Sequence, residues 1–94
     1  MARYKLLDGV AMNQGDPATF QIPSASEKAT IRPGDFVKVG FVVTRDHQEF
    51  VWAKVQAVNG KSISGVLDDD PVYADARFGE HIELERRHVL AIER

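Results

Sequence analysis

Cysteine is absent from the 94 residues of this chain, so there is neither a disulfide framework nor a thiolate that could attack a substrate or bind a metal. A long apolar run is absent too, because no stretch approaches the ~20 apolar residues of a membrane span. Near the N-terminus, Asp8 interrupts the chain before an apolar run as long as that of a signal peptide develops. We therefore expect a cytoplasmic protein that does not contact a membrane.

A strong net charge is the third absence. Twelve Lys and Arg against fourteen Asp and Glu give a net charge of -2, which disfavours the broad basic surface that a phosphate backbone attracts. With 44% hydrophobic and 28% charged residues, the composition is typical of a globular protein, and the length allows one hydrophobic core. We predict a single domain over residues 1–94, with self-association, if it occurs, being weak.

The first third of the chain shows little periodicity. Glycine, Asn and Pro interrupt its apolar start, which predicts an N-terminal arm with one edge strand. Ser24 and Glu27 have the spacing of a capping box, in which each side chain accepts a hydrogen bond from the other residue's backbone N–H, so we expect a short helix over 25–30. A turn at Arg32-Pro33-Gly34-Asp35 follows. Residues 1–34 are thus predicted to form an arm with a short helix.

From Phe36 onward the apolar residues alternate with polar ones, which is the pattern of β-strands. We predict strands over 36–43 and 51–57, joined by a polar turn over 44–48. Asn59-Gly60 predicts a tight hairpin of type I′, with positive φ at both residues, that leads into a third strand over 61–67.

Three consecutive acids and Pro71 end the third strand. A loop over 69–79 with one helical turn near 73–78 is predicted next, and then strands over 80–85 and 89–92. Short consecutive antiparallel strands favour closure, which removes exposed sheet edges. We therefore predict a mainly β fold with a short helix, in which a five-stranded antiparallel SH3-like barrel over 35–93 follows the arm.

Several short runs occur in a characteristic order: Phe20-x-Ile22-Pro23, Pro33-Gly34-Asp35-x-Val37-Lys38-Val39-x-Phe41, Trp52-x-Lys54-Val55, Gly65-x-Leu67-Asp68-Asp69-Asp70-Pro71, Gly79-Glu80-x-Ile82 and Val89–Ile92. Through them, residues 18–93 resemble the bacterial family known as domain of unknown function 2314. The chain departs from the family pattern at Glu49-Phe50-Val51-Trp52-Ala53, where the family tends to read Glu-Arg-Met-Trp-Val, and at Asp69, where it tends to have Asn. The resemblance implies a bacterial setting. The chain is more distantly similar to small immunity proteins, which neutralise toxins by binding them.

Trp52 is the most informative side chain, because the alternation that sends its neighbours Val51 and Ala53 into the core places it on the opposite face. Phe50, Lys54 and Gln56 are expected on the same face. An outward Trp beside charge is typical of a binding surface. We predict a protein-binding site at Trp52, Lys54, Asp69, Asp70 and Tyr73. The alternative is that the arm covers Trp52 as a second small core, through Tyr4, Leu6, Phe20 or Ile22.

Two other classes of function have weaker support. A nucleic-acid-binding barrel would use Lys38, Lys54 and Arg86-Arg87 as phosphate contacts. A metal-dependent hydrolase would need His81, Glu83, His88 or the run Asp68-Asp69-Asp70, but these lack a complete ligand spacing for zinc or calcium. No nucleophile elbow or phosphate-binding glycine loop is present either. We therefore expect a binding module, not an enzyme, with no cofactor, no metal and no catalytic residues.

Overall fold

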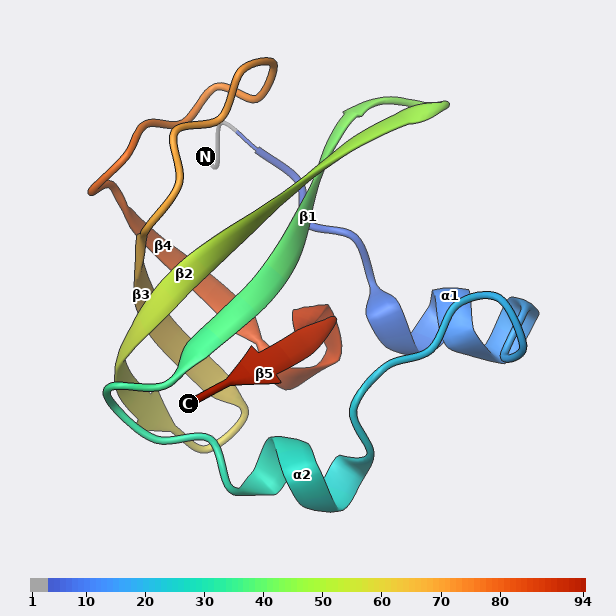
Figure 1. Cartoon of the computed structure of the whole chain (residues 1–94), viewed down its shortest axis with the longest axis horizontal. Coiled ribbons are helices and arrows are strands. Elements are labelled where there is room, and N and C mark those ends of the chain that lie inside the picture. The colour runs from blue at the N-terminus through green and yellow to red at the C-terminus, as the bar shows by residue number, and fades with distance from the viewer. Residues whose placement is uncertain (1–3) are drawn as a thin grey trace.

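The computed structural model describes residues 4–94 and is built around a five-stranded antiparallel sheet (Figure 1). The mainly β fold class is therefore confirmed. Residues 1–3, the start of the predicted arm, lie outside the described residues. The elements in chain order are α1 (Gly9–Gly15), α2 (Ala25–Ala29), β1 (Phe36–Thr44), β2 (His47–Asn59), β3 (Ser62–Leu67), β4 (His81–Glu85), the 3₁₀ helix η1 (Arg86–His88) and β5 (Ala91–Glu93).

The strands are ordered β4-β3-β2-β1-β5, so each of the first four pairs with its neighbour in the chain, and β5 returns to the free edge of β1. Only the first three residues of β1, Phe36 to Lys38, pair with β5. Along the second half of β1, Leu6 from the N-terminal arm forms a β-bridge with Phe41. The sheet is open within residues 4–94, because β4 and β5 are its two ends, and the predicted SH3-like barrel is not confirmed.

The β1–β2 hairpin is longer than the sequence suggested. Thr44 pairs with His47, so the turn consists of Arg45 and Asp46 alone, and Val43 forms a bulge beside it. Our predicted turn over 44–48 was too wide. The start of β2 was not predicted because residues 47–49 are polar. This part of the strand lies at the rim of the sheet, where burial is incomplete.

The β2–β3 hairpin turns at Gly60-Lys61, with Asn59 paired to Ser62. Only Gly60 has positive φ, at 66°, which fits a type II′ turn with glycine at its first central position and corrects the predicted type I′ turn. Further back, the register shifts between Val55 and Ala57. A bulge of this kind bends a strand, and here it lies where β2 passes from its pairing with β1 to its pairing with β3.

The segment between β3 and β4 contains no helix, so the helical turn predicted near 73–78 is wrong. The 3₁₀ helix instead lies after β4, at the charged residues Arg86–His88. Tyr73 and Ala74 donate their N–H groups to the Glu49 side chain. The N–H of Arg77, which a helical turn would donate to the carbonyl of Tyr73, donates instead to the Glu80 carboxylate at 3.1 Å.

The N-terminal arm contains one predicted and one unpredicted helix. In α2, Ser24 and Glu27 make both bonds of the capping box, which confirms this prediction. Helix α1 was missed because glycine is at both of its ends; Asp8 caps it by accepting a hydrogen bond from the backbone N–H of Ala11. A side chain at Gly9 would meet Leu90, at 2.7 Å from its Cβ, so glycine allows α1 to lie against the segment before β5.

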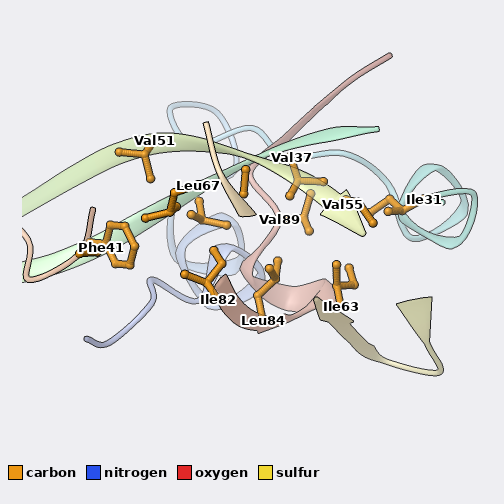
Figure 2. Close-up of a cluster of buried hydrophobic side chains, with 13 residues drawn as sticks. Ile31, Val37, Phe41, Val51, Val55, Ile63, Leu67, Ile82, Leu84 and Val89 are labelled. Atoms are coloured by element: carbon orange, nitrogen blue, oxygen red, sulfur yellow. The ribbon is translucent and has the colours of Figure 1, made fainter. Parts of the chain in front are cut away.

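The core lies on one side of the bent sheet. Figure 2 shows Val37, Val51 and Val55 of β1 and β2 directed towards Ile63, Ile82 and Leu84 of β3 and β4. Thirteen buried apolar residues form this cluster, and Tyr4 and Leu6 of the arm pack against it. The edge of the Tyr4 ring contacts Phe41, with ring centroids 5.2 Å apart. The arm therefore completes the core side of the sheet.

Candidate functional site

The opposite side of β1 and β2, which we call the outer face, carries the side chains that alternate with the core. Cross-strand pairing brings together Phe36 with Lys54, Lys38 with Trp52, and Gly40 with Phe50. Phe50 is 46% exposed and Trp52 is half-buried. Aromatic and basic residues therefore share this face.

Trp52 is only partly covered. Three of the four arm residues considered as its cover lie elsewhere: Tyr4 and Leu6 pack against the core cluster, and Ile22 lies near Gly9. The arm does approach the outer face at Gly40, where the Cβ of Leu7 would be 3.3 Å from a Cβ at that position. The ring of Phe50 in β2 covers the same glycine, and its Cε1 would be 3.2 Å from a Cβ at position 40. A larger residue at position 40 would displace this ring.

An open hollow of about 300 Å³ lies beside Trp52. Its lining comes from four parts of the chain: Phe36, Trp52, Asp68, Asp69, Glu93 and Arg94. The two aromatic residues belong to β1 and β2, whereas the acids come from the end of β3 and from β5. The hollow therefore crosses the strands.

Asp69 has a structural role in this hollow. Its carboxylate accepts a hydrogen bond from the backbone N–H of Trp52 at 2.7 Å, and the N–H of Asp68 donates to the carbonyl of Trp52 at 2.9 Å. These two bonds continue the β2–β3 ladder beyond the end of β3. The predicted site residues Trp52 and Asp69 are thus in direct contact, and Lys54 lies on the same face.

Tyr73 lies apart from Trp52. Its ring meets His47, with centroids 4.8 Å apart, and its N–H donates to Glu49 at 3.0 Å. His47 and Glu49 are on the core side of β2, since they alternate with the outward residues Phe50 and Trp52. Tyr73 is 65% exposed but on the other side of β2 from Trp52. Asp70 is exposed and has no hydrogen bond or ion pair within residues 4–94.

Glu49 fixes the segment that carries Tyr73. Its carboxylate accepts hydrogen bonds from the N–H groups of Val72 at 2.6 Å, Tyr73 at 3.0 Å and Ala74 at 2.9 Å. Partial burial of the carboxyl raises its pKa, but the three N–H donors favour the charged form more strongly, so the pKa of Glu49 lies below its ordinary value. The exposed loop is thereby anchored to the hairpin.

The basic residues proposed as phosphate contacts are largely engaged within the chain. Arg86 donates to the carbonyls of Gly60 and Lys28. Arg87 forms an ion pair with Glu85 at 3.0 Å. The ammonium of Lys38 lies 5.4 Å from the ring centroid of Phe50. Lys54 is exposed and, within residues 4–94, its side chain has no hydrogen bond or ion pair.

The histidines and acids of the metal hypothesis are not brought together. Glu83 accepts a hydrogen bond from Ser64 at 2.8 Å, and Nδ1 of His88 accepts one from the N–H of Glu85 at 2.9 Å. Within residues 4–94 no group of three or more His, Asp or Glu side chains could hold a metal ion. Burial and the neighbouring Arg87 lower the pKa of His88.

The predicted site left out five residues of the outer face and the hollow: Phe36, Phe50, Asp68, Glu93 and Arg94. Phe36 and Phe50 carry a signal that was available, because they occupy the same alternation as Trp52. Glu93 and Arg94 reach the hollow only because β5 returns beside β1. No local sequence pattern predicts this pairing of β5 with β1.

Across residues 4–94, no helix is long and apolar enough to cross a membrane. The resemblance to domain of unknown function 2314 stays a prediction. Neither a family model, nor a curated protein, nor a solved structure matches this chain.

Proposed function

We propose that this chain is a non-enzymatic binding module that recognises another protein through the outer face. The observation that carries the proposal is the aromatic surface formed by exposed Phe50, half-buried Trp52 and Phe36 beside an open hollow. Exposed aromatic side chains with a polar surround are typical anchors of protein interfaces, since they supply contact area with little loss of conformational entropy. A bacterial setting, and with it an immunity-like role, belongs to this proposal through the family resemblance.

The composition of the outer face supports contact with a partner rather than burial under another part of the same chain. Lys54 is exposed, and Lys38 extends its ammonium over the Phe50 ring. These two lysines oppose burial of the outer face by another part of the same chain, because a buried lysine loses its hydration. A partner can instead contact the aromatic rings and leave the ammonium groups in water.

A protein partner fits better than nucleic acid. The hollow is lined by Asp68, Asp69 and Glu93, which would repel a phosphate backbone. Arg86 and Arg87, moreover, already bind groups within the chain.

For the fold, we propose an SH3-like barrel that is incompletely closed. The support is that β1 has β2 on one edge, while its other edge is shared by β5 and the Leu6 bridge. The bulge at Gln56 gives β2 the bend that such an arrangement requires.

The proposal is tested by affinity capture from bacterial lysate with the wild-type chain and two outer-face variants, Phe50→Ser and Lys54→Glu. Both positions are exposed, so the variants are expected to stay folded, which thermal unfolding checks. We expect partner recovery, quantified by mass spectrometry, to fall roughly tenfold or more with Phe50→Ser.

Met12→Ser is the matched control, because Met12 is a similarly exposed apolar residue, 40% exposed, on α1. Tyr73→Ser tests whether the contact extends to the core side of β2. Proteins recovered equally by the wild type, Phe50→Ser and Lys54→Glu would rule out the outer face as the interface.

A further inference from the structure

The hollow beside Trp52 combines aromatic rings with carboxylates, which is the chemistry that recognises an organic cation. We infer that it binds an arginine side chain from an extended segment of a partner protein. This inference rests on the proposed function, because it names the group that the outer face would receive.

The floor of the hollow is aromatic. Phe36 pairs with Lys54, and Trp52 pairs with Lys38, so the two rings are diagonal neighbours on adjacent strands, with Cα atoms roughly 7–8 Å apart. A planar guanidinium can stack on a Trp or Phe ring, where the negative face of the ring attracts its charge. Within residues 4–94, no cation is placed over Trp52, because the Lys38 ammonium lies over Phe50.

Two carboxylates of the hollow are unpaired. Asp68 and Glu93 are exposed, and neither accepts a hydrogen bond or forms an ion pair within residues 4–94. Asp69 differs, since it accepts the N–H of Trp52. The hollow therefore offers two free anionic acceptors, one on each side of its aromatic floor.

The one base in the lining is already neutralised. Nε of Arg94 lies 3.3 Å from the Asp35 carboxylate, whose side chain is only 11% exposed, and its Nη2 donates to Thr30. The pair fixes Arg94 at the rim and cancels its charge locally. An incoming cation thus meets a net negative lining.

Arginine suits this site better than lysine. Its five donors can reach carboxylates in a fixed planar geometry while its flat face stacks on a ring, whereas an ammonium is a compact and strongly hydrated charge. The hollow spans from β5 to the end of β3, about 14 Å at the usual strand spacing. An extended segment of four to five residues covers roughly that distance.

Lys54 supplies a test of the sign of the ligand's charge. It lies on the outer face next to Phe36 but does not line the hollow. Replacing it with Met removes a positive charge and keeps most of the side-chain length. Binding of a cation should then stay equal or tighten, whereas binding of an anion should weaken.

The experiment titrates the full chain with an acetylated and amidated Gly-Arg-Gly-Arg-Gly peptide. The readouts are the fluorescence and the indole N–H NMR signal of Trp52, which is the only tryptophan. Two peptides of the same length carry citrulline, which is neutral and nearly isosteric, or glutamate in place of arginine. We expect saturable binding of the arginine peptide, at least roughly tenfold tighter than that of the citrulline peptide and weakened by salt.

The double variant Asp68→Asn/Glu93→Gln is expected to lose this roughly tenfold preference, because it removes both free carboxylates and leaves the Asp69 contact intact. Asp46→Asn, in the exposed β1–β2 turn, is the charge control and should bind as the wild type does. Equal affinity for the arginine and citrulline peptides, tighter binding of the glutamate peptide, or no saturable binding would overturn the inference. If partner capture still depends on Phe50 in that case, only the arginine assignment fails and the proposed function stands.

Discussion

The two faces of the β1–β2 hairpin have the same backbone and opposite chemistry. On the core face, Val37, Val39 and Ala53 are completely buried. On the outer face, their chain neighbours Lys38 and Trp52 are half-buried, and Lys54 is exposed. Because strand residues alternate between faces, one backbone ladder supports two surfaces that are under different physical constraints.

Substitutions that change the stability of this hairpin can therefore be separated from those that change its exposed surface. Core residues must match one another in volume, since close packing penalises both cavities and excess volume. Outer-face residues make few such contacts and can change with little effect on folding. Phe50 is the intermediate case, since its ring covers Gly40 while almost half of it is exposed.

The largest expected effect on stability comes from replacing a phenylalanine by alanine on the core face, compared with the same replacement on the outer face. Phe41→Ala removes a fully buried ring and should lower the free energy of unfolding by about 3–5 kcal/mol. Phe50→Ala should lower it by about 1 kcal/mol or less, because that ring is half in water already. Urea denaturation followed by Trp52 fluorescence measures both, and Phe41→Leu provides a milder variant if Phe41→Ala does not fold. Equal losses at the two positions would remove the distinction between the faces.

The second prediction concerns the loop that is attached to the core side of β2. Glu49→Ala removes the acceptor of three backbone N–H groups and should lower the free energy of unfolding by about 2 kcal/mol at pH 7, allowing for partial solvation. Amide hydrogen exchange at Val72, Tyr73 and Ala74 should accelerate. Glu93→Gln is the control, because it changes an exposed acid whose side chain has no hydrogen bond or ion pair within residues 4–94.

The pH dependence of this contact has a defined sign. The pKa of Glu49 is depressed in the folded state, so the unfolded chain binds the proton more readily, and the stabilisation exists above the unfolded value of about 4.5. It is lost as the pH falls through the lower, folded pKa. The difference in stability between the wild type and Glu49→Gln should therefore shrink below pH 4.5, and a difference that grows there would contradict the assignment.

A third, smaller effect is expected on the outer face. Asp69→Ala leaves the N–H of Trp52 without its acceptor and should lower the free energy of unfolding by about 1 kcal/mol. Asp69→Asn keeps a side-chain oxygen and should recover most of that loss. The emission maximum of Trp52 should shift with Asp69→Ala alone, and identical spectra for both variants would show that this hydrogen bond does not position the indole.

The smallest expected effect lies at the end of β4. Burial and Arg87 lower the pKa of His88, and its unprotonated Nδ1 accepts the N–H of Glu85. Below the unfolded value of 6.5, the unfolded chain takes up a proton that the folded chain resists, so stability should fall as the pH drops from 6.5 towards the folded pKa. His88→Asn, which keeps an acceptor, should flatten this slope in pH-dependent thermal unfolding, and an unchanged slope would contradict the assignment.

Local rules recovered the elements whose stability is local. Ser24 and Glu27 cap α2 with side chains three residues apart, and the Pro33-Gly34 turn places glycine at φ 98°. The alternation from Phe36 to Phe41 and from Val51 to Val55 predicted two strands and the outward direction of Trp52. These predictions needed only the period of a strand and the chemistry of a turn.

The same local rules did not predict features that depend on contacts between distant segments. The carboxylate of Glu49 in β2 accepts the N–H groups of Tyr73 and Ala74, a contact that no local pattern predicts, and the start of β2 was missed because rim residues need not be apolar. Closure of the sheet likewise depends on which distant strands pair. β5 pairs with the first three residues of β1 and not with β4, so the sheet is open within residues 4–94.

Local patterns alone predict the β-rich fold class, the short capped helix, the paired strands from Phe36 onward and the outward placement of Trp52. Each of these follows from a spacing of a few residues. The folded chain was needed to show that Trp52 borders a hollow with Asp68 and Glu93, and that Tyr73 lies on the other side of β2. The physical reason is that these arrangements depend on hydrogen bonds and strand pairings between residues from 17 to 57 positions apart, including Trp52–Asp69 and Phe36–Glu93, which no local periodicity encodes.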